Sequence, residues 1–136
     1  MPDKMSLVLF SGTDDKLMAA SIIASGGVAN DMDVDIFITF WGLTKIEKDG
    51  QKNPDVSFEG QPMKDQVFAL MKKNNVPDWV TMLKNAKEVG NIKVYGCAMF
   101  ADLLQLKKED LDPIVDDIIG VNEFVSMSKD SMTMFI

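Results

Sequence analysis

The sequence predicts an α/β fold of three layers, in which helices cover both faces of a mainly parallel sheet of about five strands. Short apolar runs alternate along the chain with longer stretches of helical periodicity. The runs are nearly continuous in apolarity, which is typical of strands covered on both faces. Because strand and helix alternate, right-handed crossovers between parallel strands are expected. Sheets of this kind bind their ligands at the carboxyl ends of the strands.

The first two strands and the helix between them are predicted within residues 5–40. Residues 5–10 form a compact apolar run that ends at Ser11-Gly12, which favours a buried strand turning directly into a helix. Thr13 can cap that helix, which continues to about Asn30. Residues 34–40 are rich in β-branched and aromatic side chains and predict the second strand.

The middle of the chain predicts a loop followed by two helices. Residues 45–62 carry lysines, acids, glycines and prolines with few apolar side chains, which indicates a long mobile loop. Residues 63–74 follow as a helix. Its expected buried side consists of Val67, Phe68, Leu70 and Met71. Another helix begins near Pro77-Asp78 and ends at Gly90.

The last third predicts two strands with helices around them. Residues 92–96 form the third strand, and the helix after Cys97 has one apolar stripe, made of Met99, Leu103 and Leu106. A short apolar piece follows at 114–119. Next comes a helix on which Val121, Phe124 and Val125 share a face. Residues 132–136 close the chain as a last strand.

Composition fits one domain spanning residues 1–136 and excludes several functions. The net charge of −7 argues against nucleic acid and anionic membranes as partners. There is one cysteine and no histidine, so serine and cysteine proteases, the usual zinc sites and an internal dithiol cycle are excluded. No metal or cofactor is expected. A lone cysteine without a signal peptide or a membrane span favours a reduced, cytoplasmic setting.

Three strand ends are the candidate parts of a site. They are the segments 11–13, 39–42 and 96–98, and they could converge on one crevice. Cys97 would be the strong nucleophile there, with N–H groups of the following helix stabilising its thiolate. Nearby Asp102 would oppose that stabilisation.

Plain structural interpretations compete with each of these. Cys97 could be a small apolar residue packed at a strand end. Ser11-Gly12-Thr13 could be a phosphate loop of a flavin or nucleotide binder, but it lacks the repeated glycines of such loops. Phe40-Trp41-Gly42 could form an apolar wall over a ligand or belong to the core.

With Cys97 placed in this way, the sequence resembles the DsrE/DsrF/DsrH-like sulfur-relay superfamily, in particular its peroxiredoxin-like DsrE subgroup. The resemblance rests on residues 7–16, on Thr-Phe-Trp-Gly-Leu at 39–43, and on residues 95–104, which are similar to the family's C-x-M-S-M-D-V-M-G. Phe100 and Ala101 replace serine and methionine of that pattern, and Gln105 replaces glycine. These departures concern the pocket around the sulfur and leave the cysteine in place.

The resemblance implies a sulfur carrier in which Cys97 holds sulfane sulfur as a persulfide and passes it to a partner thiol. The residues expected to line its pocket are Ser11, Gly12, Thr39, Phe40, Trp41, Gly42, Gly96, Met99 and Asp102. Relatives form homo-oligomers and work with TusA-like or rhodanese-like carriers, so both are expected partners, and the 45–62 loop would be a lid or docking segment. The alternatives are a non-catalytic scaffold subunit and, less favoured, a flavin or nucleotide binder on a flavodoxin/Rossmann-like fold.

Overall fold

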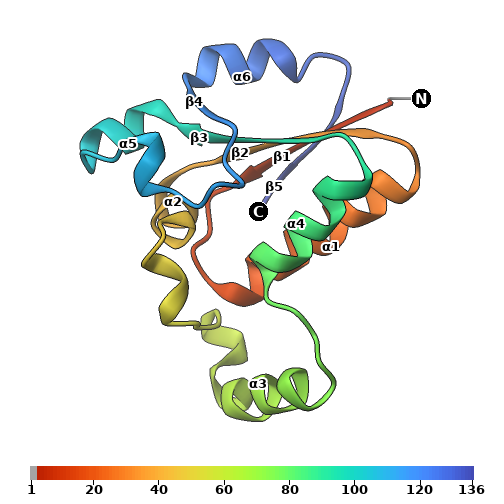
Figure 1. The fold of residues 1–136 in the computed structure, drawn as a ribbon, viewed down its shortest axis with the longest axis vertical. Coiled ribbons are helices and arrows are strands. Elements are labelled where there is room, and N and C mark those ends of the chain that lie inside the picture. Colours follow the sequence, from red (N-terminus) through yellow and green to blue (C-terminus); the bar gives the residue numbers. More distant parts are fainter. Residues whose placement is uncertain (1–2) are drawn as a thin grey trace.

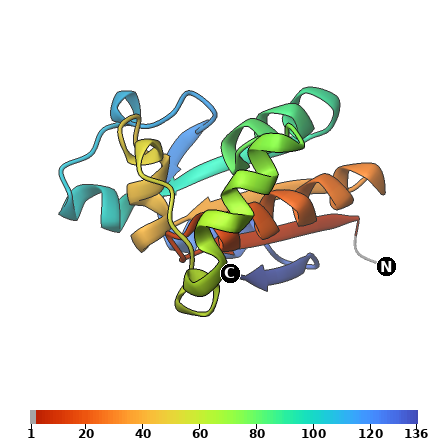
Figure 2. The same cartoon turned by 90° about the horizontal axis from the view of Figure 1, so that it is seen from below.

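A computed structural model describes residues 3–136 and contains one five-stranded parallel sheet (Figure 1). Its strands are β1 (Lys4–Leu9), β2 (Asp33–Ile38), β3 (Ile92–Cys97), β4 (Asp117–Ile119) and β5 (Met132–Phe135). Their order across the sheet is β4-β3-β2-β1-β5, and Figure 2 shows β5 beside β1. The predicted three-layer α/β fold is therefore confirmed.

Helices and short 3₁₀ turns connect the strands. The α-helices are α1 (Asp14–Ala29), α2 (Phe40–Ile46), α3 (Lys64–Lys73), α4 (Trp79–Val89), α5 (Ala98–Leu103) and α6 (Val121–Met127). The 3₁₀ turns are η1 (Gly50–Lys52), η2 (Phe58–Met63) and η3 (Lys108–Asp110). Within residues 3–136, none of the helices has the length and hydropathy that crossing a membrane requires.

Strand register divides the sheet into two faces. Leu7 pairs with Ile36, which pairs with Val94, and all three are buried on the face covered by α1 and α4. The alternate residues point to the opposite face because side chains alternate along a strand. There, the ring of Phe37 stacks on that of Phe124 in α6 at 4.8 Å.

The face under α6 is less completely covered than the other. α6 has only seven residues, and two of its apolar side chains, Val121 and Val125, are 61% and 59% exposed. The sequence correctly groups these residues on one face with Phe124, but only Phe124 is buried. An apolar opening is left beside the carboxyl ends of β2 and β3.

The expected buried side of α3 is wrong, and the apolar stripe predicted on α5 is not buried. No residue of α3 is buried, because Val67, Phe68 and Met71 face a cavity. Leu70 does not line this cavity and is 48% exposed. In α5 the buried residues are Phe100 and Ala101, whereas Met99 and Leu103 are exposed. Periodicity correctly located these helices but not the side on which the protein covers them.

The segment 45–62 contains the end of α2, η1 and the start of η2 where the sequence predicts a loop. It is fastened to the start of α1. The backbone N–H of Ser57 and its hydroxyl donate to the carboxylate of Asp15, the hydroxyl at 2.6 Å. The N–H of Asp14 donates to the Asp55 carbonyl at 2.8 Å. The mobility of this segment stays a prediction.

Candidate functional site at the end of β3

Cys97 is the last residue of β3 and the N-terminal capping residue of α5. Its side chain lies on the α6 face of the sheet, since Phe37 of β2 pairs with Tyr95 and Cys97 follows two residues later. The residue is 7% exposed. N–H groups in the first turn of a helix have no acceptor within that helix, and those of α5 lie next to the sulfur-bearing residue.

Cys97 lines two neighbouring cavities. The larger has a volume of about 650 Å³ and lies between the sheet and α6. Besides Cys97, its lining residues are Val8, Phe10, Phe37, Thr39, Phe40, Met99, Val121, Phe124, Val125, Ser128, Lys129, Thr133 and Phe135. The smaller, of about 320 Å³, is lined by Phe40, Cys97, Met99, Phe100, Asp102 and Leu103. Phe40 and Met99 belong to both cavities and stand at the boundary between them.

The aromatic rings of Phe10, Phe40 and Phe100 line these cavities next to one another, and Trp41, which lines neither, packs against them. Phe40 stacks on Phe100 at 4.6 Å and contacts Phe10 at 4.9 Å. Trp41 meets Phe100 edge to face at 6.1 Å. Phe100, which stands where the family pattern has serine, is buried and supports the ring of Phe40. Phe100, in place of serine, therefore adds an apolar ring next to the cysteine.

Phe40 begins α2 instead of ending β2, which corrects the predicted strand end. Its φ is +45°, a left-handed conformation that costs a bulky residue about 1–3 kcal/mol. The stacking partners hold the ring in place despite this cost. Gln105 replaces the family's glycine and also has a positive φ, of 56°, which glycine adopts without strain.

Two glycines let the first turn and α2 approach closely. A Cβ on Gly42 would lie 2.8 Å from the carbonyl oxygen of Leu9, and a Cβ on Gly12 would lie 2.6 Å from that of Trp41. The N–H of Gly42 donates to the Phe10 carbonyl at 3.1 Å. The Thr-Phe-Trp-Gly-Leu segment is thereby fixed against the end of β1.

The predicted pocket residues fall into three groups. Thr39, Phe40 and Met99 line the larger cavity with Cys97, and Asp102 lines the smaller. Ser11, Gly12 and Trp41 instead line a separate cavity of about 710 Å³ beside the last residues of the chain. Gly42 and Gly96 are buried in the surrounding packing. Thr13 takes the capping position of α1, but its hydroxyl has no hydrogen-bond partner among residues 3–136.

Sequence reasoning missed much of the larger cavity. Phe10, Phe37 and Phe135 come from the ends of three strands, and Val121 and Val125 come from α6. Phe37 could have been found, because it shares a face with Thr39 on an alternating strand. Phe135 could not, since its position depends on the pairing of β5 with β1, where it lies opposite Val8.

One charged residue lines each of these cavities, Lys129 the larger and Asp102 the smaller. A titratable side chain on the same sheet face is Tyr95. Burial, followed by the negative charges of Asp35 and Asp116, raises the pKa of Tyr95 above its ordinary value. Tyr95 therefore stays neutral at physiological pH.

Comparison with known proteins identifies the class. The sequence pattern of the DsrE/DsrF/DrsH-like family matches residues 2–69 and 57–136, and the chain belongs to this family. It is 35% identical over 158 aligned positions to the uncharacterized protein YrkE of Bacillus subtilis (strain 168), covering 98% of this chain and 96% of that protein.

Two solved structures share the fold. One is a protein of unknown function, MTH1491 from Methanobacterium thermoautotrophicum, with a TM-score of 0.60, 10% identity and 98% coverage of both chains. The other is the YchN protein of Escherichia coli, with a TM-score of 0.61, 13% identity and 100% coverage of both chains. Both likenesses concern the fold.

Proposed function

We propose that the protein is a cytoplasmic sulfur carrier that holds sulfane sulfur as a persulfide on Cys97. The observation that carries the proposal is the placement of the chain's one cysteine at the carboxyl edge of the sheet, where it lines both cavities. Membership of the DsrE/DsrF/DrsH-like family supports it.

The chemistry requires one thiolate and no cofactor. The Cys97 thiolate attacks the terminal sulfur of a donor persulfide, the donor S–S bond breaks, and the donor leaves as a thiolate. An acceptor thiolate then attacks the outer sulfur on Cys97, which returns to its thiolate form. Sulfane sulfur moves without net oxidation or reduction.

The larger cavity offers room for the added sulfur. Its walls are mostly apolar, and Phe40 and Met99 lie next to the thiol. A persulfide enclosed there would be kept from water and from further oxidation. The N–H groups at the start of α5 would favour its negative charge.

Partners are expected at the apolar rim of the site. Met99 is 83% exposed, Leu103 is 73% exposed and Phe135 is 70% exposed. Exposed apolar patches of this kind mark interaction sites. We assign the rim to a TusA-like or rhodanese-like carrier that brings or takes sulfur, and to a second copy of the chain in a homo-oligomer.

The experiment is sulfur loading followed by intact mass measurement. The protein and its Cys97→Ser variant are incubated with polysulfide and desalted. The native protein is expected to gain the mass of one sulfur atom, and the variant is not. No gain on the native protein, while a known carrier is loaded in parallel, would refute the proposal.

A scaffold function is the second candidate, because Cys97 is only 7% exposed. In that case the thiol is inert and the fold serves assembly alone. Titration with an aromatic disulfide separates the two. A carrier thiol reacts in the native protein, whereas an inert thiol reacts at a comparable rate only after unfolding.

A further inference from the structure

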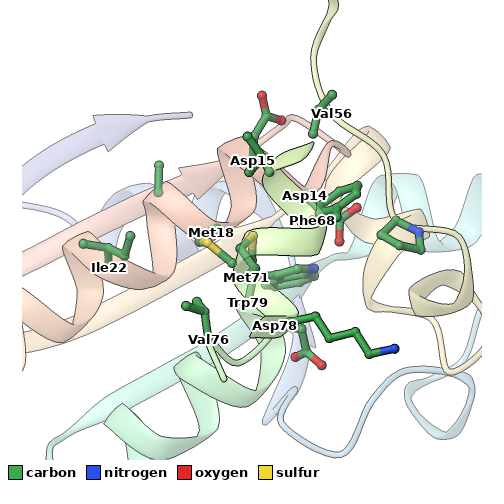
Figure 3. A pocket seen from close by; sticks show the side chains of 14 residues that line it. Asp14, Asp15, Met18, Ile22, Val56, Phe68, Met71, Val76, Asp78 and Trp79 are labelled. Carbon is green, nitrogen blue, oxygen red and sulfur yellow. The ribbon is translucent and has the colours of Figure 1, made fainter. Parts of the chain in front are cut away.

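A further cavity, of about 560 Å³, lies on the opposite side of the sheet from Cys97, beneath α3 (Figure 3). Met18 and Ile22 of α1 form one wall, Val67, Phe68 and Met71 of α3 form another, and Trp79 lies between them. Small-molecule sites have volumes of about 300–1,000 Å³ and mostly apolar walls. This cavity matches that description.

α3 faces the rest of the protein across this cavity and is only partly covered by it. None of its residues is buried, and Val67 is still 38% exposed although it lines the cavity. Figure 1 shows α3 at the end of the molecule away from α6. An apolar molecule between α3 and α1 would bury surface that the helix now leaves exposed, which favours occupancy.

Trp79 brings a polar group to the lining of the cavity. The residue is 2% exposed, and among residues 3–136 its indole N–H donates a hydrogen bond to no protein acceptor, although its nitrogen keeps contact with solvent. Figure 3 shows the nitrogen at the end of the ring away from Met18. A ligand that displaces water from the cavity must supply an acceptor for this N–H, so a ligand that brings an acceptor oxygen is favoured over one that leaves the donor unpaired.

Charges at the rim select against anions. Asp14, Asp15 and Asp78 line the cavity, against one lysine, Lys72. Burial would raise the pKa of Asp15, but the hydrogen bonds from the Ser57 hydroxyl and N–H lower it overall. The rim therefore stays negative at neutral pH.

We propose that the cavity under α3 binds a small, uncharged aromatic molecule carrying one carbonyl-type acceptor, which receives a hydrogen bond from the Trp79 indole. The site is independent of the Cys97 chemistry, since it lies on the α1 and α4 side of the sheet. Failure of sulfur loading therefore leaves this proposal standing, and the reverse also holds.

The test uses three naphthalene probes and the indole N–H resonances of the ¹⁵N-labelled protein. A Trp41→Phe variant assigns the Trp79 signal, because the chain has two tryptophans. We expect 2-acetylnaphthalene to move that signal downfield in a saturable way. 2-Ethylnaphthalene, which has no acceptor, should perturb α3 without the downfield shift, and anionic 2-naphthoate should bind at least about tenfold more weakly.

Matched variants on α3 locate the site. Val67→Ser should weaken 2-acetylnaphthalene binding about tenfold, since it removes apolar contact from the wall. Leu70→Ser is the control, because Leu70 is 48% exposed on the same helix and does not line the cavity. Equal weakening by both variants, an unmoved Trp79 signal up to the solubility limit, or shifts confined to residues around Cys97 would each overturn the proposal.

Discussion

At the scale of single residues, the site depends on positions where the backbone restricts which side chain is tolerated. Cys97 could be placed from sequence because a short apolar run ends beside it. The helical start at Phe40 could not be placed, since a positive φ at a phenylalanine contradicts local preference. The rings of Phe10, just after β1, and of Phe100 in α5 hold it there. Contacts between distant segments decided that position.

Substitution of Gly42 tests the close packing beneath the aromatic rings. Gly42→Ala should destabilise the protein by about 1–3 kcal/mol, because the new Cβ would lie 2.8 Å from the Leu9 carbonyl oxygen. Gly26→Ala in α1 is the control. A Cβ there meets nothing within 4 Å, and alanine favours a helix by about 1 kcal/mol. Urea unfolding measures both changes, and a neutral Gly42→Ala would show that the turn relaxes freely.

At the scale of elements, the sequence identified the strands better than the covered faces of the helices. Strands buried on both faces produce apolar runs whatever lies next to them. An amphipathic helix such as α3 or α5 shows only that it has an apolar side. In both, that side faces a cavity, and no local signal distinguishes a cavity from a packed core.

Substitution of Asp112 tests how the segment after α2 is attached to the rest of the protein. Its carboxylate accepts hydrogen bonds from the Ile114 N–H at 3.0 Å, from Gln51 at 3.1 Å and from Lys84 at 3.1 Å. Burial would raise the pKa of Asp112, but these bonds lower it overall below the ordinary 3.8. The stabilisation is therefore present above pH 3.8 and is lost as the pH falls through the lower folded pKa.

Asp112→Asn should cost about 1 kcal/mol at pH 7, allowing for solvent screening. The difference from the native protein should shrink as the pH falls below 3.8 towards the lower folded pKa, because the carboxyl of Asp112 takes up a proton first in the unfolded state. Urea midpoints at pH 7 and pH 3 measure it. A difference that is the same at both pH values would contradict the role of the ionised carboxylate.

At the scale of the whole molecule, the two faces of the sheet differ in how they are covered. α1 and α4 close one face, while α6 leaves an apolar rim around Cys97 on the other. A chain of 15.1 kDa that exposes such a rim is expected to associate through it. The sequence could not reveal this rim, since it combines residues from α5, α6 and β5.

Charge introduced at the rim should dissociate the proposed homo-oligomer. Met99→Lys replaces a side chain that is 83% exposed on α5. Val89→Lys on α4, where the valine is 80% exposed, is the matched control on the other face. Sedimentation velocity should give a multiple of 15.1 kDa for the native protein and the control, and a monomer for Met99→Lys. A native protein that sediments as a monomer would contradict the assignment of the rim.

A sulfur carrier must both accept one sulfur atom on Cys97 and release it. The most direct measurement loads the protein with polysulfide, removes the excess, adds glutathione and follows intact mass together with the glutathione products. Each chain should gain one sulfur atom on Cys97 and then lose it as glutathione persulfide appears in equal amount. A protein that gains no sulfur, or that gains sulfur equally in Cys97→Ser, would contradict this expectation.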